Sequence, residues 1–307
     1  MSRNPERNDR KSGRKPPPGS KGGGRSDAPR GGGKGPPSSG PDRGGWNPNP
    51  PARTFSDSAP RPSRAKADAD NFVWGRHPVL AALANPARRG MGRLLATPDR
   101  AAELERDNLA HGHRIETIEP QVLDRMLPPG AVHQGFAFKV QPLEGVALHD
   151  LAEPASGVIV MLDQLTDPQN VGAIFRSALA FGARGIIVQD RHSPALAGAL
   201  AKASAGATER LPCARVTNLS RALEALAELG WRAVGLDGAA EATLEQALDA
   251  RPTVLVLFSE GDGIRRLVAE HCDVLARIPM PGGFESLNVS NAAAVALYEA
   301  RRAASGT

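Results

Sequence analysis

Short, continuously apolar runs alternate with helical segments over the second half of this 307-residue chain, and this alternation constrains the fold more than any other feature. The runs include residues 157–163, 185–189 and 253–258, each flanked by polar residues, glycine or proline. Strands that are apolar along their whole length are typical of a parallel sheet covered by helices on both faces. The sequence therefore predicts an α/β fold, in which ligands bind beyond the carboxyl ends of the strands.

The same alternation extends along the rest of this region and predicts the boundaries of its elements. Further strands are expected at 210–216, 231–237 and 275–280, and helices at 170–181, 195–203, 219–229, 264–271 and 289–303.

A second, shorter alternation precedes this region and indicates a small α/β domain. Strands are expected at 71–74, 93–97, 114–118 and 133–140, and helices around Pro78, near 100–111 and from Pro120. We expect the small domain over 71–142, a linker with proline and glycine over 143–156, and the larger domain over 157–307.

The first 70 residues have a different composition from the rest of the chain. They hold 12 glycines and 13 prolines, with Trp46 and Phe55 as the only aromatic residues, so we expect this tail to be disordered. It carries 15 Lys and Arg against 7 Asp and Glu, a net +8, whereas the whole chain is +5 and the remainder therefore −3. A basic arm of this kind is typical of RNA-binding proteins; a solubilising leader without a partner is the alternative.

Several classes of protein are disfavoured by what the sequence lacks. It has no apolar run of the roughly 18 residues that a membrane span needs, and no apolar signal-peptide core. Cys213 and Cys272 lie far apart, which favours reduced thiols in the cytoplasm. No Cys/His cluster has zinc spacing, so we expect no metal site. The sequence contains no Walker A or Gly-x-Gly-x-x-Gly motif, so a nucleotide-dependent redox enzyme or a kinase is disfavoured.

The turn after residue 163 carries the first candidate site residues. Asn170, after Pro168, is expected to be the N-cap of the next helix. Gly172 and Arg176 lie four apart on one helix face, so the glycine would leave space for a phosphate or ribose beside the guanidinium. A plain cap and an ordinary salt bridge remain alternatives for Asn170 and Arg176.

Two further turns have polar residues beyond what local structure requires. Residues 259–263, Ser-Glu-Gly-Asp-Gly, follow an apolar strand, and their glycines would let backbone approach a ligand. Before the last helix, Ser286, Asn288, Ser290 and Asn291 lie within six positions, although a helix needs one cap. The surplus predicts binding or catalysis.

Together the three turns resemble the three ordered motifs of the SpoU-type RNA ribose 2′-O-methyltransferases of the SPOUT superfamily. The resemblance covers about residues 72–303, and it is greatest to the bacterial enzymes that methylate a guanosine ribose of 23S ribosomal RNA. The stretches GRHPVLAAL, HQGFAF and ARVTNLSRAL carry that closer likeness. The motifs are Asn170-x-Gly172-x-x-x-Arg176, Ser259-Glu260-Gly261, and Ile278-Pro279-Met280 with Ser286-Leu287-Asn288-Val289-Ser290.

The resemblance implies a fold and a set of partners. The larger domain would contain a deep trefoil knot, which ordinary chain topology excludes, and the small domain would resemble ribosomal protein L30e and bind RNA. S-adenosylmethionine would bind in the knot, held largely by backbone. The protein would be a homodimer with active sites near the subunit interface.

The resemblance also implies residue roles. Arg176 would activate the ribose 2′-hydroxyl; because a guanidinium has a pKa above about 12, we expect it mainly to bind phosphate and stabilise alkoxide charge. Asn170 and Glu260 would shape the site and hold Arg176, while Ser286 and Asn288 would contact substrate or the arginine and order the cofactor loop. Phe258 stands where the family usually has glycine. The expected cofactor contacts are Phe258, Ser259, Gly261, Ile278, Met280, Ser286 and Leu287.

Two other functions remain open from the sequence. One is methylation of a transfer RNA ribose, and the other is a non-catalytic RNA-binding factor for ribosome assembly that keeps the fold. The aromatic residues of the small domain also have two possible roles. They would pack in its core, which is expected for most of them, or stack on exposed RNA bases. They are Phe72, Trp74, Phe136 and Phe138.

Overall fold

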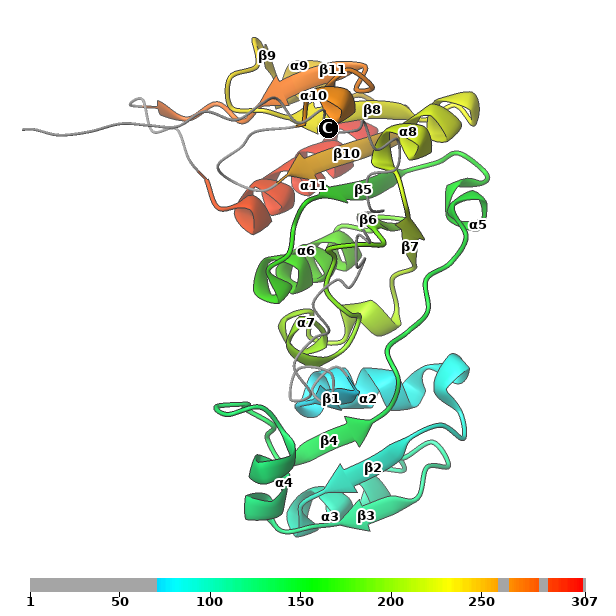
Figure 1. The fold of residues 1–307 in the computed structure, drawn as a ribbon, viewed down its shortest axis with the longest axis vertical. Helices are drawn as coiled ribbons and strands as arrows, with labels where there is room; N and C mark the ends of the chain where they lie inside the picture. The colour runs from blue at the N-terminus through cyan, green and yellow to red at the C-terminus, as the bar shows by residue number, and fades with distance from the viewer. Residues whose placement is uncertain (1–70, 259–264, 282–286, 306–307) are drawn as a thin grey trace, which may run out of the picture. The chain divides into compact units, whose positions relative to one another are not determined.

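The computed structural model describes residues 71–258, 265–281 and 287–305 (Figure 1), which belong to one compact unit, Ser58–Thr307. The basic tail, expected to be disordered, lies outside the described residues. Among the helices of the described residues, none has the length and apolar character to cross a bilayer.

The small domain is a four-stranded sheet with helices on both faces. Its strand order is β1-β4-β2-β3, antiparallel except between β2 and β3. The strands are β1 (Phe72–Trp74), β2 (Arg93–Ala96), β3 (Ile115–Thr117) and β4 (Phe136–Lys139). The helices are α2 (Arg76–Ala84), the 3-10 helix η1 (Pro86–Arg88), α3 (Pro98–Arg106) and α4 (Pro120–Met126).

The four aromatic residues of the small domain are part of its core. Phe72 and Trp74 lie on one face of the sheet with Leu123 of α4, and Phe136 and Phe138 lie on the other face with α2 and α3. None is more than 5% exposed. Core packing is therefore their role, and stacking of these rings on RNA bases is excluded because burial leaves no ring face free.

The large domain is a seven-stranded parallel sheet, as the apolar runs predicted. The strand order is β7-β6-β5-β10-β8-β11-β9, and every neighbouring pair is parallel. The strands are β5 (Val158–Asp163), β6 (Gly185–Gln189), β7 (Cys213–Val216), β8 (Arg232–Leu236), β9 (Ala242–Thr243), β10 (Thr253–Phe258) and β11 (Val274–Arg277).

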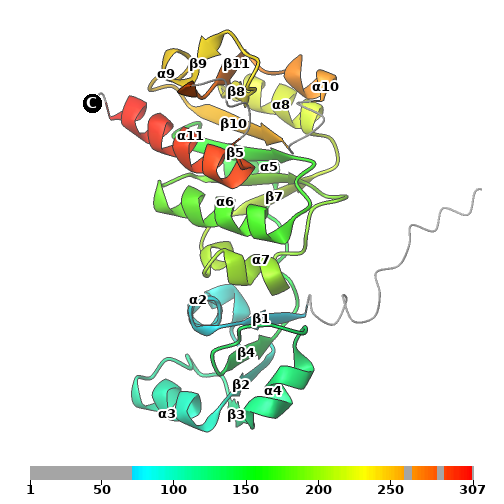
Figure 2. The same cartoon turned by 90° about the vertical axis from the view of Figure 1, so that its left-hand side faces the viewer.

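Helices cover both faces of this sheet (Figure 2). One face packs against α6 (Pro168–Ala180), α7 (Gly198–Ala203), α9 (Leu244–Ala247) and α11 (Val289–Ala304); the 3-10 helix η2 (Ala207–Glu209) follows α7. The other face packs against α5 (Leu148–Ala152), α8 (Leu219–Glu228) and α10 (Arg266–Ala269). The segment expected as a linker thus contains α5, whose Leu151 and Ala152 are buried.

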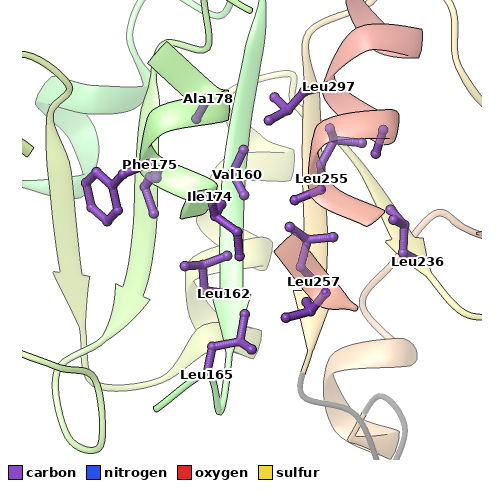
Figure 3. Close-up of a cluster of buried hydrophobic side chains, with 14 of the residues drawn as sticks. Val160, Leu162, Leu165, Ile174, Phe175, Ala178, Leu236, Leu255, Leu257 and Leu297 are labelled. Carbon is purple, nitrogen blue, oxygen red and sulfur yellow. The ribbon is translucent and has the colours of Figure 1, made fainter. Parts of the chain in front are cut away.

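The core between the sheet, α6 and α11 holds these elements in place (Figure 3). Leu255 and Leu257 of β10 contribute to the same cluster as Ile174 of α6 and Leu297 of α11. Each such side chain contributes about 1.5–3 kcal/mol when fully buried. The result is that the starts of α6 and α11 are held over the same sheet.

The seam between the two domains is closed by a buried ion pair. Arg88 of η1 contacts Glu209 of η2 through two nitrogens at 2.8 Å, and the two side chains are 3% and 1% exposed. Asn85 also donates to Glu209, and Arg88 donates to the Gln141 carbonyl. At the same seam, a Cβ at Gly206 would lie 2.6 Å from Cβ of Ala81. Around this ion pair the domains therefore meet in a packed, hydrogen-bonded contact.

Candidate active site

The sheet topology brings the three motif-bearing turns to one edge. Phe258, the last residue of β10, pairs with Asp163, the last residue of β5, so the first and second turns leave adjacent strands. The third turn follows β11, which is separated from β10 only by β8. Because neighbouring strands lie about 4.8 Å apart, the ends of β10 and β11 are about 10 Å apart.

The N-cap of α6 is Asp167, which corrects the expectation that Asn170 caps this helix. Both carboxylate oxygens of Asp167 accept hydrogen bonds, from the backbone N–H groups of Gln169 and Asn170, each at 3.1 Å. Asp167 precedes Pro168, and proline is favoured at the first helical position, so the helix starts earlier than expected. The side chain of Asn170 is therefore not used by the cap.

Asn288 connects the third motif to the first. Its Oδ1 caps α11 by accepting from the Ser290 backbone N–H at 2.9 Å and from the Ser290 hydroxyl at 2.6 Å. Its Nδ2 donates to Oδ1 of Asn170 at 3.1 Å. Asn170 is half-buried and Asn288 is exposed. Among the described residues, nothing accepts from the amide nitrogen of Asn170, so its N–H groups remain available to a ligand.

The polar surplus before α11 is thus explained in part. Asn288 caps the helix, and Ser290 supports the cap through its hydroxyl. Asn291 is exposed, and Ser286 lies outside the described residues. Two of the four residues have local structural roles, and Asn288 has a second role in the bridge to Asn170.

Gly172 has a packing role, contrary to the expectation that it leaves space for a ligand. A Cβ there would lie 2.5 Å from Cβ of Ala203 and 2.7 Å from the carbonyl oxygen of Leu200. The missing side chain is what allows α7 to pack directly on α6. No space for a phosphate or ribose remains beside Gly172.

Arg176 lies apart from the two asparagines within the protomer. It is exposed and lines a hollow of about 510 Å³ that also includes residues of α2 and of the turn after α7. Asn170 precedes it by six residues, which is about 240° around an α-helix. The structure therefore brings Asn170 and Asn288 together and places Arg176 on a different side of α6.

An ion pair at the strand ends, in which only the carboxylate is buried, was missed by sequence reasoning. The carboxylate of Asp163 is 1% exposed and contacts Arg265, with Nη2 at 2.5 Å from Oδ1 and Nε at 2.9 Å from Oδ2. Arg265 is the N-cap residue of α10. The pair fixes the start of α10 to the end of β5. The local signal for this pair in the sequence is Asp163 itself, an acidic residue at the end of an otherwise apolar strand.

The predicted cofactor contacts divide between described and undescribed residues. Phe258, Ile278, Met280 and Leu287 are half-buried at the ends of β10 and β11 and before α11. Ser259, Glu260, Gly261 and Ser286 lie outside the described residues.

Half-buried apolar side chains lie on both faces of the sheet at this edge. Ile278 packs against the core on the α6 and α11 face. Val254, Val256 and Phe258 occupy every second position of β10, and the two valines lie on the face covered by α8. Phe258 therefore points to the α8 face, as does Asp163, its partner on β5. Half-exposed apolar side chains beside strand ends suit a flat, apolar ring with a few backbone hydrogen bonds. Within the described ranges, His, Cys, Asp and Glu side chains form no group of three able to hold a metal ion.

Neither cysteine is suited to nucleophilic chemistry. Both thiols are free, and burial raises the pKa of Cys213 and of Cys272 to about 12. A thiolate is the reactive form, so both remain protonated at neutral pH.

Comparison with known proteins identifies the family of the chain. Residues 157–298 match the SpoU rRNA Methylase family, and residues 72–146 match the RNA 2′-O ribose methyltransferase substrate binding family. A protein of Mycolicibacterium smegmatis named as a tRNA/rRNA methyltransferase is 39% identical over 259 residues, 82% of each chain. A Mycobacterium avium protein with the same description is 38% identical over 269 residues, 83% of this chain and 84% of its own.

Solved structures give the same result. The SpoU methyltransferase AviRb of Streptomyces viridochromogenes, in complex with AdoMet, matches with a TM-score of 0.64 at 28% identity, over 75% of this chain and 89% of its own. The AdoMet-bound rRNA methyltransferase of Sinorhizobium meliloti matches with a TM-score of 0.62 at 26% identity, over 75% and 86%. These matches identify an RNA methyltransferase. The chain belongs to the SpoU family, whose members use S-adenosylmethionine as methyl donor.

Proposed function

We propose that the protein methylates the 2′-hydroxyl of a guanosine ribose in 23S ribosomal RNA. The hydrogen bond between Asn170 and Asn288 carries this proposal, because it joins the first and third motifs at the edge where the sheet binds ligands. The closer likeness of the stretches GRHPVLAAL, HQGFAF and ARVTNLSRAL to the 23S enzymes supports the choice of RNA.

The reaction needs the acceptor oxygen to be held in line with the donor methyl group. When bound, S-adenosylmethionine would supply the electrophilic methyl group of a sulfonium, and the protein would hold the ribose 2′-hydroxyl in line with it while the hydroxyl proton is lost to solvent. Positioning of this kind contributes up to about 7–11 kcal/mol. Arg176 binds the neighbouring phosphate and stabilises developing charge on O2′.

Other residues of the motifs hold the donor and order the site. Phe258, Ile278, Met280 and Leu287 line its adenosine end, together with Ser259, Gly261 and Ser286. Asn170 and Asn288 orient the acceptor, and Glu260 supports Arg176. The deep trefoil knot and the likeness of the small domain to ribosomal protein L30e remain predictions of the resemblance.

The protein acts as a homodimer in this proposal. Arg176 lies on a different side of α6 from the pair formed by Asn170 and Asn288, so a second copy would bring an arginine to the asparagine pair. Mixed dimers of Arg176→Ala and Asn288→Ala subunits test this. We expect the mixed dimers to be faster than either variant alone, because one site in each mixed dimer regains both residues; a rate no higher than that of the single variants contradicts the shared site.

Methyl transfer from labelled S-adenosylmethionine tests the function. Transcripts of 23S ribosomal RNA and total transfer RNA serve as acceptors, and ribose-methylation mapping locates the product. Label in the 23S transcript at one guanosine is expected. Label only in transfer RNA would shift the proposal to the transfer RNA alternative. Donor binding measured by calorimetry, without transfer to any RNA, would favour the non-catalytic assembly factor.

The tail is part of the same proposal, as a cytoplasmic RNA-binding arm. Deletion of residues 1–70 removes a net charge of +8. Because each phosphate contact contributes to the salt dependence of binding, the deletion should flatten that dependence and leave the methyl-transfer step intact. If the deletion leaves the salt dependence of RNA binding unchanged, the tail is a solubilising leader without an RNA partner.

A further inference from the structure

A hollow at the domain seam carries positive charge that the motifs do not explain. This seam hollow, about 510 Å³, is bounded by α2, α6 and the turn that joins α7 to η2. Arg176, Arg210 and His77 line it together with the apolar side chains of Leu80 and Leu179. No carboxylate is among its lining residues.

The two arginines of the seam hollow are available for a ligand. Both are exposed, and within the described part of the chain neither side chain is paired with a carboxylate or carbonyl. Other arginines near the site differ: Arg88 and Arg265 are each bound to an acidic side chain. Guanidinium groups that converge on a surface free of acids favour a polyanion, and they bind phosphate in a bidentate manner.

The position of Arg210 is fixed by the seam beside it. Its neighbour Glu209 is held by Arg88 and Asn85 in the buried ion pair. Gly206 packs so closely on α2 that a Cβ would lie 3.1 Å from the His77 carbonyl oxygen. The φ of Gly206 is 91°, which favours glycine at this turn. Arg210 therefore extends from a rigid base.

We propose that the seam hollow binds the backbone of the RNA strand that carries the acceptor nucleotide, with Arg210 on a phosphate of that strand. The inference rests on the proposed function, because Arg176 also lines the hollow and in that function lies next to the reacting ribose. Leu80 and Leu179 add apolar surface to the same hollow, which suits a sugar or base. Arg210 is an RNA-binding residue outside the three motifs.

Arg210→Gln tests the proposal by filter binding to a 23S ribosomal RNA transcript over a range of salt concentrations. We expect about tenfold weaker binding at physiological salt and a salt slope reduced by about one. Arg210→Lys should retain the slope and part of the affinity. Arg221→Gln is the matched control, since Arg221 is an exposed arginine of α8 on the opposite face of the sheet, and it should bind as the wild type does.

Two further readouts make the outcome specific. Donor affinity by calorimetry and thermal unfolding should be unchanged in Arg210→Gln, because the side chain is exposed and has no hydrogen-bond or ion-pair partner among the described residues. Wild-type affinity and slope in this variant, or an equal loss in Arg221→Gln, would overturn the inference. A wild-type protein that binds RNA in an Arg210-dependent way but transfers no methyl group would instead refute the proposed function and support the binding site.

Discussion

The domain seam and the edge where β5, β10 and β11 end both depend on polar side chains, but they use them differently. At the seam, Arg88 and Glu209 are almost fully buried and their polar atoms are paired within the protein. At the edge, Asn170 and Asn288 are at least partly exposed, and hydrogen-bonding capacity remains. Complete pairing under burial fixes geometry, whereas incomplete pairing at a surface leaves groups for a ligand.

The largest effect is expected at the seam. Arg88→Ala leaves the carboxylate of Glu209 buried without its cationic partner, which should lower the free energy of unfolding by about 3–5 kcal/mol. Denaturant unfolding measures this. The double variant Arg88→Met/Glu209→Leu should recover most of the loss, because it removes the unpaired charge. If the free energy of unfolding of Arg88→Ala falls by only a few tenths of a kcal/mol, the buried pair at the seam does not stabilise the fold more than the exposed side chains at the strand ends.

The asparagine bridge should affect turnover more than stability. Asn288→Asp keeps an oxygen to cap α11 but cannot donate to Asn170, so methyl transfer should fall about 100-fold, or about 2.7 kcal/mol in the barrier. Asn288→Ala should show the same fall and lose about 1 kcal/mol of stability with the cap. Rates and thermal unfolding of the two variants separate cap from bridge. Full turnover in Asn288→Asp would show that the bridge is structural only.

Gly172 is expected to contribute to the packing of α6 and not to ligand binding. Gly172→Ala should cost about 1–3 kcal/mol of stability, because the added methyl meets Ala203 and the backbone of Leu200. Donor affinity by calorimetry should stay the same. Ser177→Ala on the same helix is the control, with a change within about 0.5 kcal/mol. Weakened donor binding in a stable Gly172→Ala protein would show that this glycine contributes to the ligand site.

The smallest effect is expected for an ion pair in solvent. Hydrogen bonding from Arg251 is the main cause that lowers the pKa of Asp249 to about 2. A carboxylate with a lowered folded-state pKa stabilises the protein above its unfolded value of about 3.9, and this contribution is lost as the pH falls toward about 2. Because Asp249 is 43% exposed, Asp249→Asn should cost less than about 1 kcal/mol at neutral pH.

Unfolding of the wild type and Asp249→Asn at pH 7 and in mild acid measures this contribution. The difference should shrink as the pH falls and as salt is added. A difference as large as that of Arg88→Ala would mean that burial does not set the strength of these pairs.

The strands and helices were predictable where their signal is local. The apolar runs of β5, β6 and β10 and the pattern of α11 lie within a few residues of the expected ranges. β9 has only two residues, and α5 lies in a segment with proline and glycine, so neither has a pattern long enough to detect. Asn170 was predicted as a cap because its type suits that position; Asp167, three residues earlier, suits it equally and is followed by the favoured proline.

The contacts that build the site were not predictable from local signals. The pairs between Arg88 and Glu209, Asp163 and Arg265, and Asn170 and Asn288 join residues 121, 102 and 118 positions apart. Each depends on the strand order or on domain packing. The motifs predicted Asn170 and Asn288 as site residues, but their direct hydrogen bond follows only from the way α6 and α11 pack over one sheet.

The strand order has a consequence for synthesis on the ribosome. β5, β6 and β7 emerge first and can pair in sequence, but β10, which lies between β5 and β8, is translated about 90 residues after β5. Until then the nascent chain has an open strand edge at β5, a place where other chains can add. β10 closes that edge, and α11, translated later, brings Asn288 to Asn170, so a chain terminated before residue 253 would keep the open edge and lack the asparagine pair.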